Sequence, residues 1–552
     1  MKSTIKPLLI LVALGFSEQS VADVDLNRLI KAQQDIDRST RQENRVVKKD
    51  VWSKVESFKI NNIDFPIEEH CIEIDELILN NDFLHDASIK KIKADVAGRC
   101  LGSVGVGKLA TELQDYFINS GYVTTRIDVP SQDLSTKKLI LDVVPGRIES
   151  VIIEGNDVRD WILPFKSGEI LNVRDIEQGL EVLQKVPGLN VKINIEPGSQ
   201  GGYSNVLINT GRTKNWNARA WVNNWGDKGT GRNLMGGAGY LYNLTKMNDV
   251  FYLSGTTNAE HESGRYNSVS AYYSIPYGYW DYELFYSNSK SRQVINIDPY
   301  AFNYNGNSEY LSLKAARTVY RDMDKKVTLS AELLRRKVNY KLEDVELALQ
   351  KRDMNNVRFG VNFKKNMPGA LLDTTLSYQR FLPWLGAEYT PDMDSGDVSR
   401  QSNLFNLDVN YTKLLNLPLV ESYYELRMGG QYSPDALTLQ DQFTIGNRWN
   451  VRGFENSAGL YGDSGFYAQN TVNFITGLSN LEWYVGTDYG AIFNDHNSQD
   501  SYNNKQLLGA TTGLKGSFKS LGYDISLSRP LISPDAFNTD KFTANFNIYY
   551  QL

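Results

Sequence analysis

Two histidine–serine pairs could supply a nucleophile and a base. His261 precedes Ser263, and His496 precedes Ser498, in each case by two positions. A hydrolase acting on membrane lipid would need such a pair within hydrogen-bond reach near the membrane surface. Spacings this short are common by chance, and the whole chain has four histidines. We therefore expect no enzyme, no metal site and no cofactor.

A second candidate is a charged group in a long connection. An arginine motif lies within residues 434–463, and a loop of this length is usually functional or disordered. The motif consists of Val451, Arg452, Gly453 and Phe454. The planar fork of Arg452 matches a carboxylate, and alternation along a later strand turns Asp488 inward. We expect the loop to fold inward and pair Arg452 with Asp488, while Gly486 and Gly490 leave room for its backbone. The alternative is an arginine on a solvated loop.

The elements that must position these residues are strands. From Phe542 to Leu552, apolar residues alternate with polar ones up to the last residue. An apolar outer face over a polar inner face is typical of a closed barrel in a membrane. Sixteen such strands can be marked, an even number that suits a single-chain bacterial barrel. They begin near residues 216, 233, 248, 265, 279, 308, 325, 355, 370, 402, 420, 464, 480, 506, 519 and 541.

Tyrosine is concentrated in the same region. Only Tyr116, Tyr122 and Tyr203, of the 32 tyrosines, precede residue 212. Aromatic residues at both membrane interfaces give a barrel this composition. Sixteen strands also make a tube wide enough for an aqueous channel unless something fills it. Residues 212–552 therefore predict a transmembrane β-barrel.

Residues 1–22 have the layout of a secretory signal. Lys2 and Lys6 flank the start of the apolar run Pro7–Phe16, which is too short to span a bilayer. Small residues at Ser20 and Ala22 suit cleavage after position 22, and an uncleaved anchor is the alternative. Residues 41–55 are polar and charged, which predicts a linker.

Residues 23–40 predict a helix with a thin apolar stripe. The stripe consists of Leu26, Leu29, Ile30 and Ile36. So narrow a stripe does not suit a dry core, but it suits a polar, water-filled lumen. A solvated, half-disordered arm is the alternative.

Residues 56–145 and 146–211 hold two similar α+β units, each read as a strand, two helices and two strands. The first contains Phe58–Ile63, the apolar-periodic segment Ile72–Leu84, the helix Lys108–Asn119, and the strands Tyr122–Val129 and Leu139–Val144. The second contains the strand Ile148–Glu154, the helix Val173–Lys185, and the strands Val191–Glu196 and Asn205–Ile208. A strand edge can accept another chain by β-augmentation. We expect such an edge at Tyr122, Val123, Thr125 and Ile127.

Both cysteines of the chain lie in the first unit. In an oxidising compartment we expect Cys71 and Cys100 to form a disulfide, and two free thiols are the alternative. The formal net charge is -6, with acids and bases mixed along the chain. No basic stripe or binding motif points to nucleic acid.

In the order of its parts, the chain resembles the TpsB transporters of two-partner secretion, such as FhaC, ShlB and CdiB, which are relatives of BamA. Three segments of the second unit resemble the family's second POTRA domain. They are Pro145–Ile148, Leu171–Leu180, and Pro197-Gly198 with Gly202–Ser204. Val451–Phe454 resembles the family's VRG[Y/F] motif at the tip of a sixth loop inserted in the lumen. Asp488 stands where the family places its acidic partner. Leu552 departs from the terminal phenylalanine of many outer-membrane barrels, although it keeps the apolar outward position.

The resemblance implies a bacterial outer-membrane protein with a 16-stranded barrel, two periplasmic POTRA domains (residues 56–145 and 146–211) and an N-terminal plug helix. It implies export of one large secreted exoprotein, such as a contact-dependent inhibition toxin, an adhesin or a haemolysin. The POTRA domains would capture the N-terminal secretion domain of that partner while it is unfolded, and the helix would leave the pore before export. Outer-membrane lipid and the barrel assembly machinery are further expected partners, and we expect a monomer.

Two other functions fit parts of the sequence. A BamA-like insertase would also carry POTRA domains, but two POTRA units and a plug helix favour secretion. A diffusion porin would not require POTRA domains. A gene for a very large exoprotein beside this one would favour export.

Overall fold

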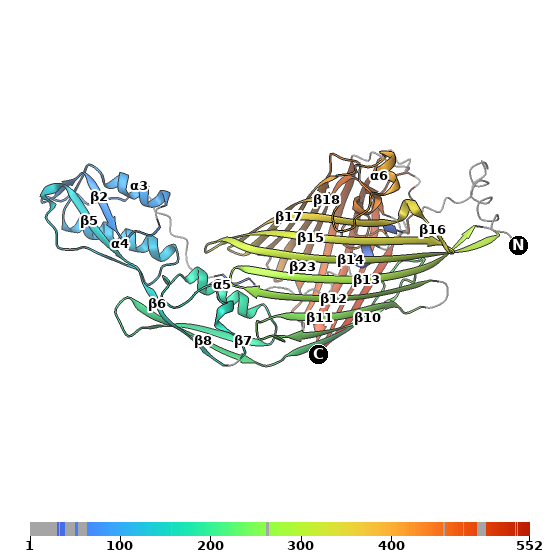
Figure 1. Cartoon of the computed structure of the whole chain (residues 1–552), viewed down its shortest axis with the longest axis horizontal. Coiled ribbons are helices and arrows are strands. Elements are labelled where there is room, and N and C mark those ends of the chain that lie inside the picture. The colour runs from blue at the N-terminus through green and yellow to red at the C-terminus, as the bar shows by residue number, and fades with distance from the viewer. Residues whose placement is uncertain are drawn as a thin grey trace.

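The protein consists of two small α+β domains followed by a barrel, with the first domain farthest from the barrel (Figure 1). No helix among the described residues is both long and apolar enough to cross a bilayer. The computed structural model describes residues 30–31, 34–38, 50–52, 63–84, 86–155, 157–260, 264–297, 299–418, 420–455, 459–478, 480–493, 504–535, 537 and 539–552. Some of the expected segments lie outside the described residues. They are the predicted signal (1–22), most of the predicted linker and both histidine–serine pairs.

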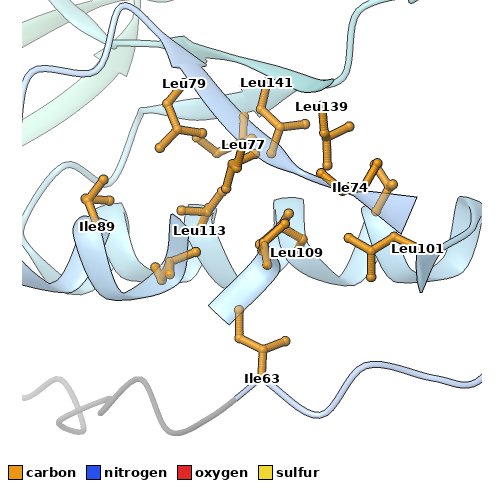
Figure 2. Close-up of a cluster of buried hydrophobic side chains, with 14 of the residues drawn as sticks. Ile63, Ile74, Leu77, Leu79, Ile89, Leu101, Leu109, Leu113, Leu139 and Leu141 are labelled. Atoms are coloured by element: carbon orange, nitrogen blue, oxygen red, sulfur yellow. The ribbon is translucent and has the colours of Figure 1, made fainter. Parts of the chain in front are cut away.

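The first domain packs two helices against a three-stranded sheet in the order β2-β5-β4. Strands β2 and β5 are parallel, and β4 is antiparallel to β5. Apolar side chains from the sheet and from both helices meet in one core, which Figure 2 shows. The elements are β1 (Ile72–Ile74), β2 (Glu76–Asn80), α3 (Ala87–Val96), β3 (Arg99–Leu101), α4 (Ser103–Asn119), β4 (Arg126–Asp128), η1 (Leu134–Thr136) and β5 (Lys138–Val144).

At the start of each helix of this domain, a carboxylate accepts hydrogen bonds from backbone amides that have no partner within the helix. Asp86 accepts hydrogen bonds from the amides of Ser88 and Ile89 at the start of α3. Glu68 accepts from the amides of Gly102, Val104 and Gly105 at the start of α4. Burial raises the pKa of Glu68, but these amides outweigh it and lower the pKa below its ordinary value.

One expectation for this domain is wrong. The segment Ile72–Leu84 forms β1 and β2 in place of a helix, and the missing helix is α3, further along. Ile74, Leu77 and Leu79 are buried. The spacing of Leu77 and Leu79 is the period of a strand, and Asp75 breaks the segment into two short pieces.

The disulfide Cys71–Cys100 joins the start of β1 to β3, and the two Cα atoms lie 5.2 Å apart. Replacing both cysteines by serine should lower the free energy of unfolding of this domain by about 3–4 kcal/mol, because the unfolded chain regains the entropy of a loop of about 30 residues. Pulse proteolysis of the full chain at rising urea concentration would measure this loss. An unchanged midpoint would contradict it.

The second domain has a sheet in the order β6-β8-β7, with β6 parallel and β7 antiparallel to β8. It holds one α-helix and a short 3-10 turn, where two helices were expected. Leu163 and Phe165 in the connection after that turn are buried in the core and occupy the space of a second helix. The elements are β6 (Arg147–Glu154), η2 (Asp160–Ile162), α5 (Val173–Gln184), β7 (Leu189–Pro197) and β8 (Tyr203–Arg212).

Sixteen antiparallel strands close the barrel by pairing β27 with β9, and the two-residue β16 adds to β15 only. The short elements α6 (Pro391–Ser395), β21 (Phe443–Ile445) and β22 (Leu460–Gly462) lie in connections between these strands. The strands are β9 (Trp216–Asn223), β10 (Leu234–Tyr242), β11 (Val250–Asn258), β12 (Arg265–Tyr277), β13 (Trp280–Ile297), β14 (Tyr300–Arg321), β15 (Lys325–Leu342), β16 (Val345–Glu346), β17 (Arg352–Met367), β18 (Ala370–Leu382), β19 (Asn403–Leu415), β20 (Ser422–Tyr432), β23 (Ser464–Ile475), β24 (Leu481–Phe493), β25 (Gln506–Phe518), β26 (Leu521–Ile532) and β27 (Thr543–Gln551).

The two faces of the barrel differ as the alternation predicts. Leu333, Phe359 and Leu376 are about half exposed on the outer face. On the inner face, Arg358 donates hydrogen bonds to Glu332 and Gln379. Charge on a lipid-facing surface at mid-membrane costs about 2–4 kcal/mol, so the charged side chains line the lumen.

Candidate functional site: the barrel lumen and the segments inside it

The long connection 434–463 folds into the barrel as an ordered loop. It contains η4 (Leu439–Asp441) and an antiparallel pair, β21 (Phe443–Ile445) and β22 (Leu460–Gly462). This small hairpin holds the described part of the loop, in which residues 456–458 are not described. Asp463 accepts hydrogen bonds from the amide of Leu437 and the side chain of Gln442 at the base of the hairpin.

Arg452 meets Asp488 at the tip of this loop. Its Nε lies 2.6 Å from Oδ2 and its Nη2 lies 2.7 Å from Oδ1 of Asp488, so the contact is bidentate. The backbone amide of Arg452 also donates to Oδ2, at 2.9 Å. Nη2 donates further to the hydroxyl of Thr471, at 2.9 Å. The Asp488 side chain is fully buried, so the carboxylate depends on these donors for its solvation.

Glycines on the barrel wall make room for the arginine. A Cβ atom at Gly486 would lie 2.5 Å from Nη2 of Arg452, and one at Gly490 would lie 2.8 Å from Cγ2 of Val451. Gly453 has φ +110°, a conformation that favours glycine. Gly509, which sequence analysis missed, faces the carbonyl of Arg452 so closely that any side chain would clash with it. Glycine is common in strands, so only the contact with Arg452 in the folded protein shows why position 509 must be glycine.

The two apolar members of the motif anchor the tip. Val451 and Phe454 are almost fully buried in one cluster with residues from β24, β25 and the last connection of the barrel. The loop is therefore held by an apolar contact and an ion pair together. The other buried members of the cluster are Ile445, Leu460, Ile492, Leu507 and Phe537.

The N-terminal segment is helical where it is described, at residues 30–31 and 34–38, and it lies inside the barrel. Ile30 is fully buried among Ile295, Tyr304, Val338 and Tyr340 of strands β13, β14 and β15. Ile36 is fully buried beside Trp225, Leu234 and Tyr266. Leu26 and Leu29, the other expected members of the apolar stripe, lie outside the described residues.

Polar bonds connect this helix to the wall and to the inserted loop. Asp37 accepts hydrogen bonds from the hydroxyls of Tyr266 and Ser289 on the wall, each at 2.8 Å. Asp35 accepts from the side chain of Asn447 in the loop, at 2.8 Å. The ammonium group of Lys31 donates to the carbonyl of Gln442, at 2.7 Å. The helix and the loop therefore occupy the lumen as one bonded assembly.

Beside them a lumen cavity of about 490 Å³ remains. Its lining carries charges of both signs from the helix, the loop and the wall. Aromatic side chains, among them Tyr252, Tyr272, Phe285 and Tyr310, lie between these charges. The charged lining residues are Asp35, Arg38, Glu283, Lys314, Glu332, Arg336, Arg358, Asp408 and Asp441.

A cluster of buried charges connects the second domain, the barrel and the chain that follows the helix. Arg321 of β14 pairs with Glu181 of α5 at 2.7 Å, and Lys326 of β15 pairs with the same carboxylate at 2.6 Å. Lys326 also contacts Asp50, whose other oxygen lies 2.7 Å from Nζ of Lys364. We call these five residues the junction cluster. Sequence analysis missed it, although acids at positions 177 and 181 on one face of α5 were a possible signal.

Burial raises the pKa of Asp50, but the ammonium groups of Lys326 and Lys364 outweigh it and lower the pKa below its ordinary value. The charged contact therefore contributes stability above about pH 4, the unfolded pKa, and loses it as pH falls through the folded pKa. At neutral pH, Asp50→Asn should free residues 50–52 from the barrel, whereas lowering the pH of the unsubstituted chain from 7 to 5 should not. The mobility of a nitroxide at position 51 measures this. Asp64→Asn is the control, and an immobile label in Asp50→Asn would contradict the prediction.

The expected strand edge in the first domain is only partly available. Strand β4 lies at an edge of its sheet but spans only Arg126–Asp128, so Tyr122 and Val123 precede it. Thr125 and Ile127 are buried, and the partly buried Tyr122 packs against the core of this domain. Three of the four residues expected at the edge therefore face the core of the domain. Val123, 40% exposed, is the one of the four that faces solvent.

Comparisons with known proteins match both the barrel and the two α+β domains to family models. A family model described as haemolysin secretion/activation protein ShlB/FhaC/HecB matches residues 202–516. Two POTRA models match residues 70–146, as the ShlB-type domain, and residues 147–197. The chain belongs to the ShlB/FhaC/HecB family. It is a TpsB-type outer-membrane transporter of two-partner secretion with POTRA domains, which lie in the periplasm in this family, and the resemblance drawn from the sequence is confirmed.

Relatives of this TpsB protein cover nearly its whole length. The outer membrane transporter CdiB-2 of Burkholderia pseudomallei is 31% identical over 83% of this chain and 80% of its own. The hemolysin transporter protein ShlB of Serratia marcescens is 25% identical over 95% of each chain. The solved structure of CdiB from Acinetobacter baumannii matches with a TM-score of 0.82 and 24% identity over 97% of this chain and 100% of that one. At that identity the likeness supports the fold alone.

Proposed function

We propose that this transporter captures the N-terminal secretion domain of one large exoprotein in the periplasm and passes the unfolded chain through the barrel lumen. The observation that carries the proposal is the assembly inside the lumen. A helix bonded to the wall and to the loop lies inside a sixteen-stranded tube. Water can replace its polar contacts, and among its described residues only Ile30 and Ile36 are anchored in small apolar clusters. The helix is therefore the removable part and the loop, held by Arg452 and its apolar anchors, is the fixed part.

Capture begins, in this proposal, at the free edge of β4. Val123 and Val129 are 40% and 48% exposed on either side of this short strand. An extended polypeptide can add its backbone to the edge and place apolar side chains against these two valines. Folding of the exported chain outside the cell then supplies the drive, which is consistent with a periplasm that lacks ATP.

The test uses a candidate exoprotein, which a gene for a very large secreted protein beside this one would identify. Val123→Asp with Val129→Asp should weaken binding of its purified N-terminal domain to the full-length transporter by about tenfold or more, since each lost apolar contact is worth about 1 kcal/mol or more. Val104→Asp, at a 63% exposed position of α4, is the matched control. Unchanged binding in the double variant would contradict capture at β4.

The main alternative is an insertase for other barrels. It predicts that cells carrying a deletion of this gene accumulate unassembled barrels. Export predicts instead that one exoprotein stays in the periplasm while other barrels assemble normally. Comparing outer-membrane composition with surface display of the exoprotein in the same deletion strain separates the two functions.

A further inference from the structure

An outward-facing group of cations lies at the extracellular ends of β12, β13 and β15. Arg265 of β12 stands directly opposite Arg292 of β13, and Lys290 stands opposite Asn267 one pair further along. The next strands continue the first row with Asn305 and Lys341. All four cations are exposed. We call Arg265, Lys290, Arg292 and Lys341 the basic row.

The basic row faces the membrane side of the barrel. Alternation places Arg265 on the same face of β12 as Val269, which is 53% exposed, and Lys290 on the same face of β13 as Tyr286 and Leu284. Those apolar residues belong to the lipid-facing band, so the cations stand where that band ends at the extracellular surface. Figure 1 shows β13 and β14 extending to the end of the molecule opposite the POTRA domains.

This arrangement of charges is unfavourable by itself. Like charges directly opposite each other on neighbouring strands destabilise the pair. Lys341 stands opposite the carboxylate of Glu346 in β16. Among the described residues, Arg265, Lys290 and Arg292 form no ion pair with a carboxylate, and their cross-strand partners are Asn267, Asn305, Asn307 or another arginine. Arg292 is held in place by a neutral acceptor, since its Nε and Nη2 donate to the Oδ1 atom of Asn303 at 3.1 and 2.8 Å. An anion bound between the arginines would turn this repulsion into attraction.

The neighbouring side chains indicate the kind of anion. Carboxamides surround the cations, at Asn267, Asn303, Asn305 and Asn307. Guanidinium groups match phosphate oxygens, carboxamides match the hydroxyls of a sugar, and the apolar band below matches acyl chains. We propose that the basic row binds the phosphorylated sugar headgroup of an outer-leaflet glycolipid, and that this contact fixes the β12–β13 hairpin at the membrane surface. This site is independent of the proposed capture and export of an exoprotein.

A titration of the full-length protein in detergent with fluorescent diphosphoryl lipid A tests the site. Arg265→Gln with Arg292→Gln should weaken binding by about tenfold or more, because two charge-assisted contacts are lost. Arg265→Lys with Arg292→Lys should keep part of the affinity. The matched control is Lys413→Gln, an outward-facing lysine near the opposite, periplasmic end of β19. Thermal melting of the barrel checks that every variant is folded.

Three results would overturn the proposal. The first is equal affinity of the unsubstituted chain and the double glutamine variant for diphosphoryl lipid A. The second is equal affinity of the unsubstituted chain for the same lipid with both phosphates removed, since acyl chains alone would then account for binding. The third is direct binding of an acidic polyglutamate peptide by the unsubstituted chain together with no binding of lipid A, which would assign this face to a protein.

Discussion

Arg452→Ala should abolish secretion while the barrel still assembles. The substitution leaves the fully buried Asp488 carboxylate without its bidentate partner, and breaking a buried pair from one side costs about 3–5 kcal/mol. A loop that loses this much binding energy leaves its docked position at least about a hundredfold more often. The loop also holds the helix through Gln442 and Asn447, so the resting assembly in the lumen loosens with it.

The reciprocal exchange separates a direct pair from general disruption. Arg452→Asp with Asp488→Arg should recover part of the secretion that each single substitution loses. Recovery stays incomplete because the exchanged pair cannot reproduce the bonds from Arg452 to Thr471 and to the carbonyl of Asn470. Arg400→Ala, which breaks an exposed pair with Asp394, is the control and should have little effect. Secretion is measured by surface display of the exoprotein, and no recovery in the exchanged protein would count against a direct pair.

Strand alternation was sufficient to predict the barrel because lipid and water on opposite faces impose a strict period of two. The sixteen strands begin close to the expected positions, with β14 the largest exception, at Tyr300 in place of residue 308. Its first residues extend beyond the lipid-facing band, and there the alternation is reversed, because the outward positions 303 and 305 are asparagines while the inward Tyr304 is buried. The POTRA domains were harder to predict, since a short buried strand such as β2 and a short buried helix share the same apolar residues.

Contacts distant in sequence could be predicted only where charge or shape restricted them. The pair of Arg452 and Asp488 could be predicted because an inward-facing carboxylate and an arginine in a loop folded into the lumen attract each other. Gly509 gave no local signal, and the two acids on one face of α5 did not by themselves indicate the junction cluster, since the partners of both sites lie far away in the sequence. The complete burial of Ile30 and Ile36 could not be predicted either, because a thin apolar stripe fits a solvated arm as well as a plug.

Removing the helix should convert a closed channel into an open one. The described helical residues are bonded to Tyr266 and Ser289 on the wall and to Asn447 in the loop, and the tube around them is wide. A gentler change, Asp35→Asn with Asp37→Asn, weakens these bonds without removing the helix and should give intermediate, flickering openings. Asp394→Asn on an exposed connection is the matched control.

Single-channel conductance in planar bilayers, comparing the mature chain with a deletion of residues 23–40, would show whether the N-terminal helix closes the pore. We expect small, flickering currents from the mature chain and large, steady currents from the deletion, because the helix occupies the lumen of a wide pore. Equal currents from the two proteins would contradict this. In that case the helix would not close the channel, and the loop held by Arg452 and Asp488 would be the structure that does.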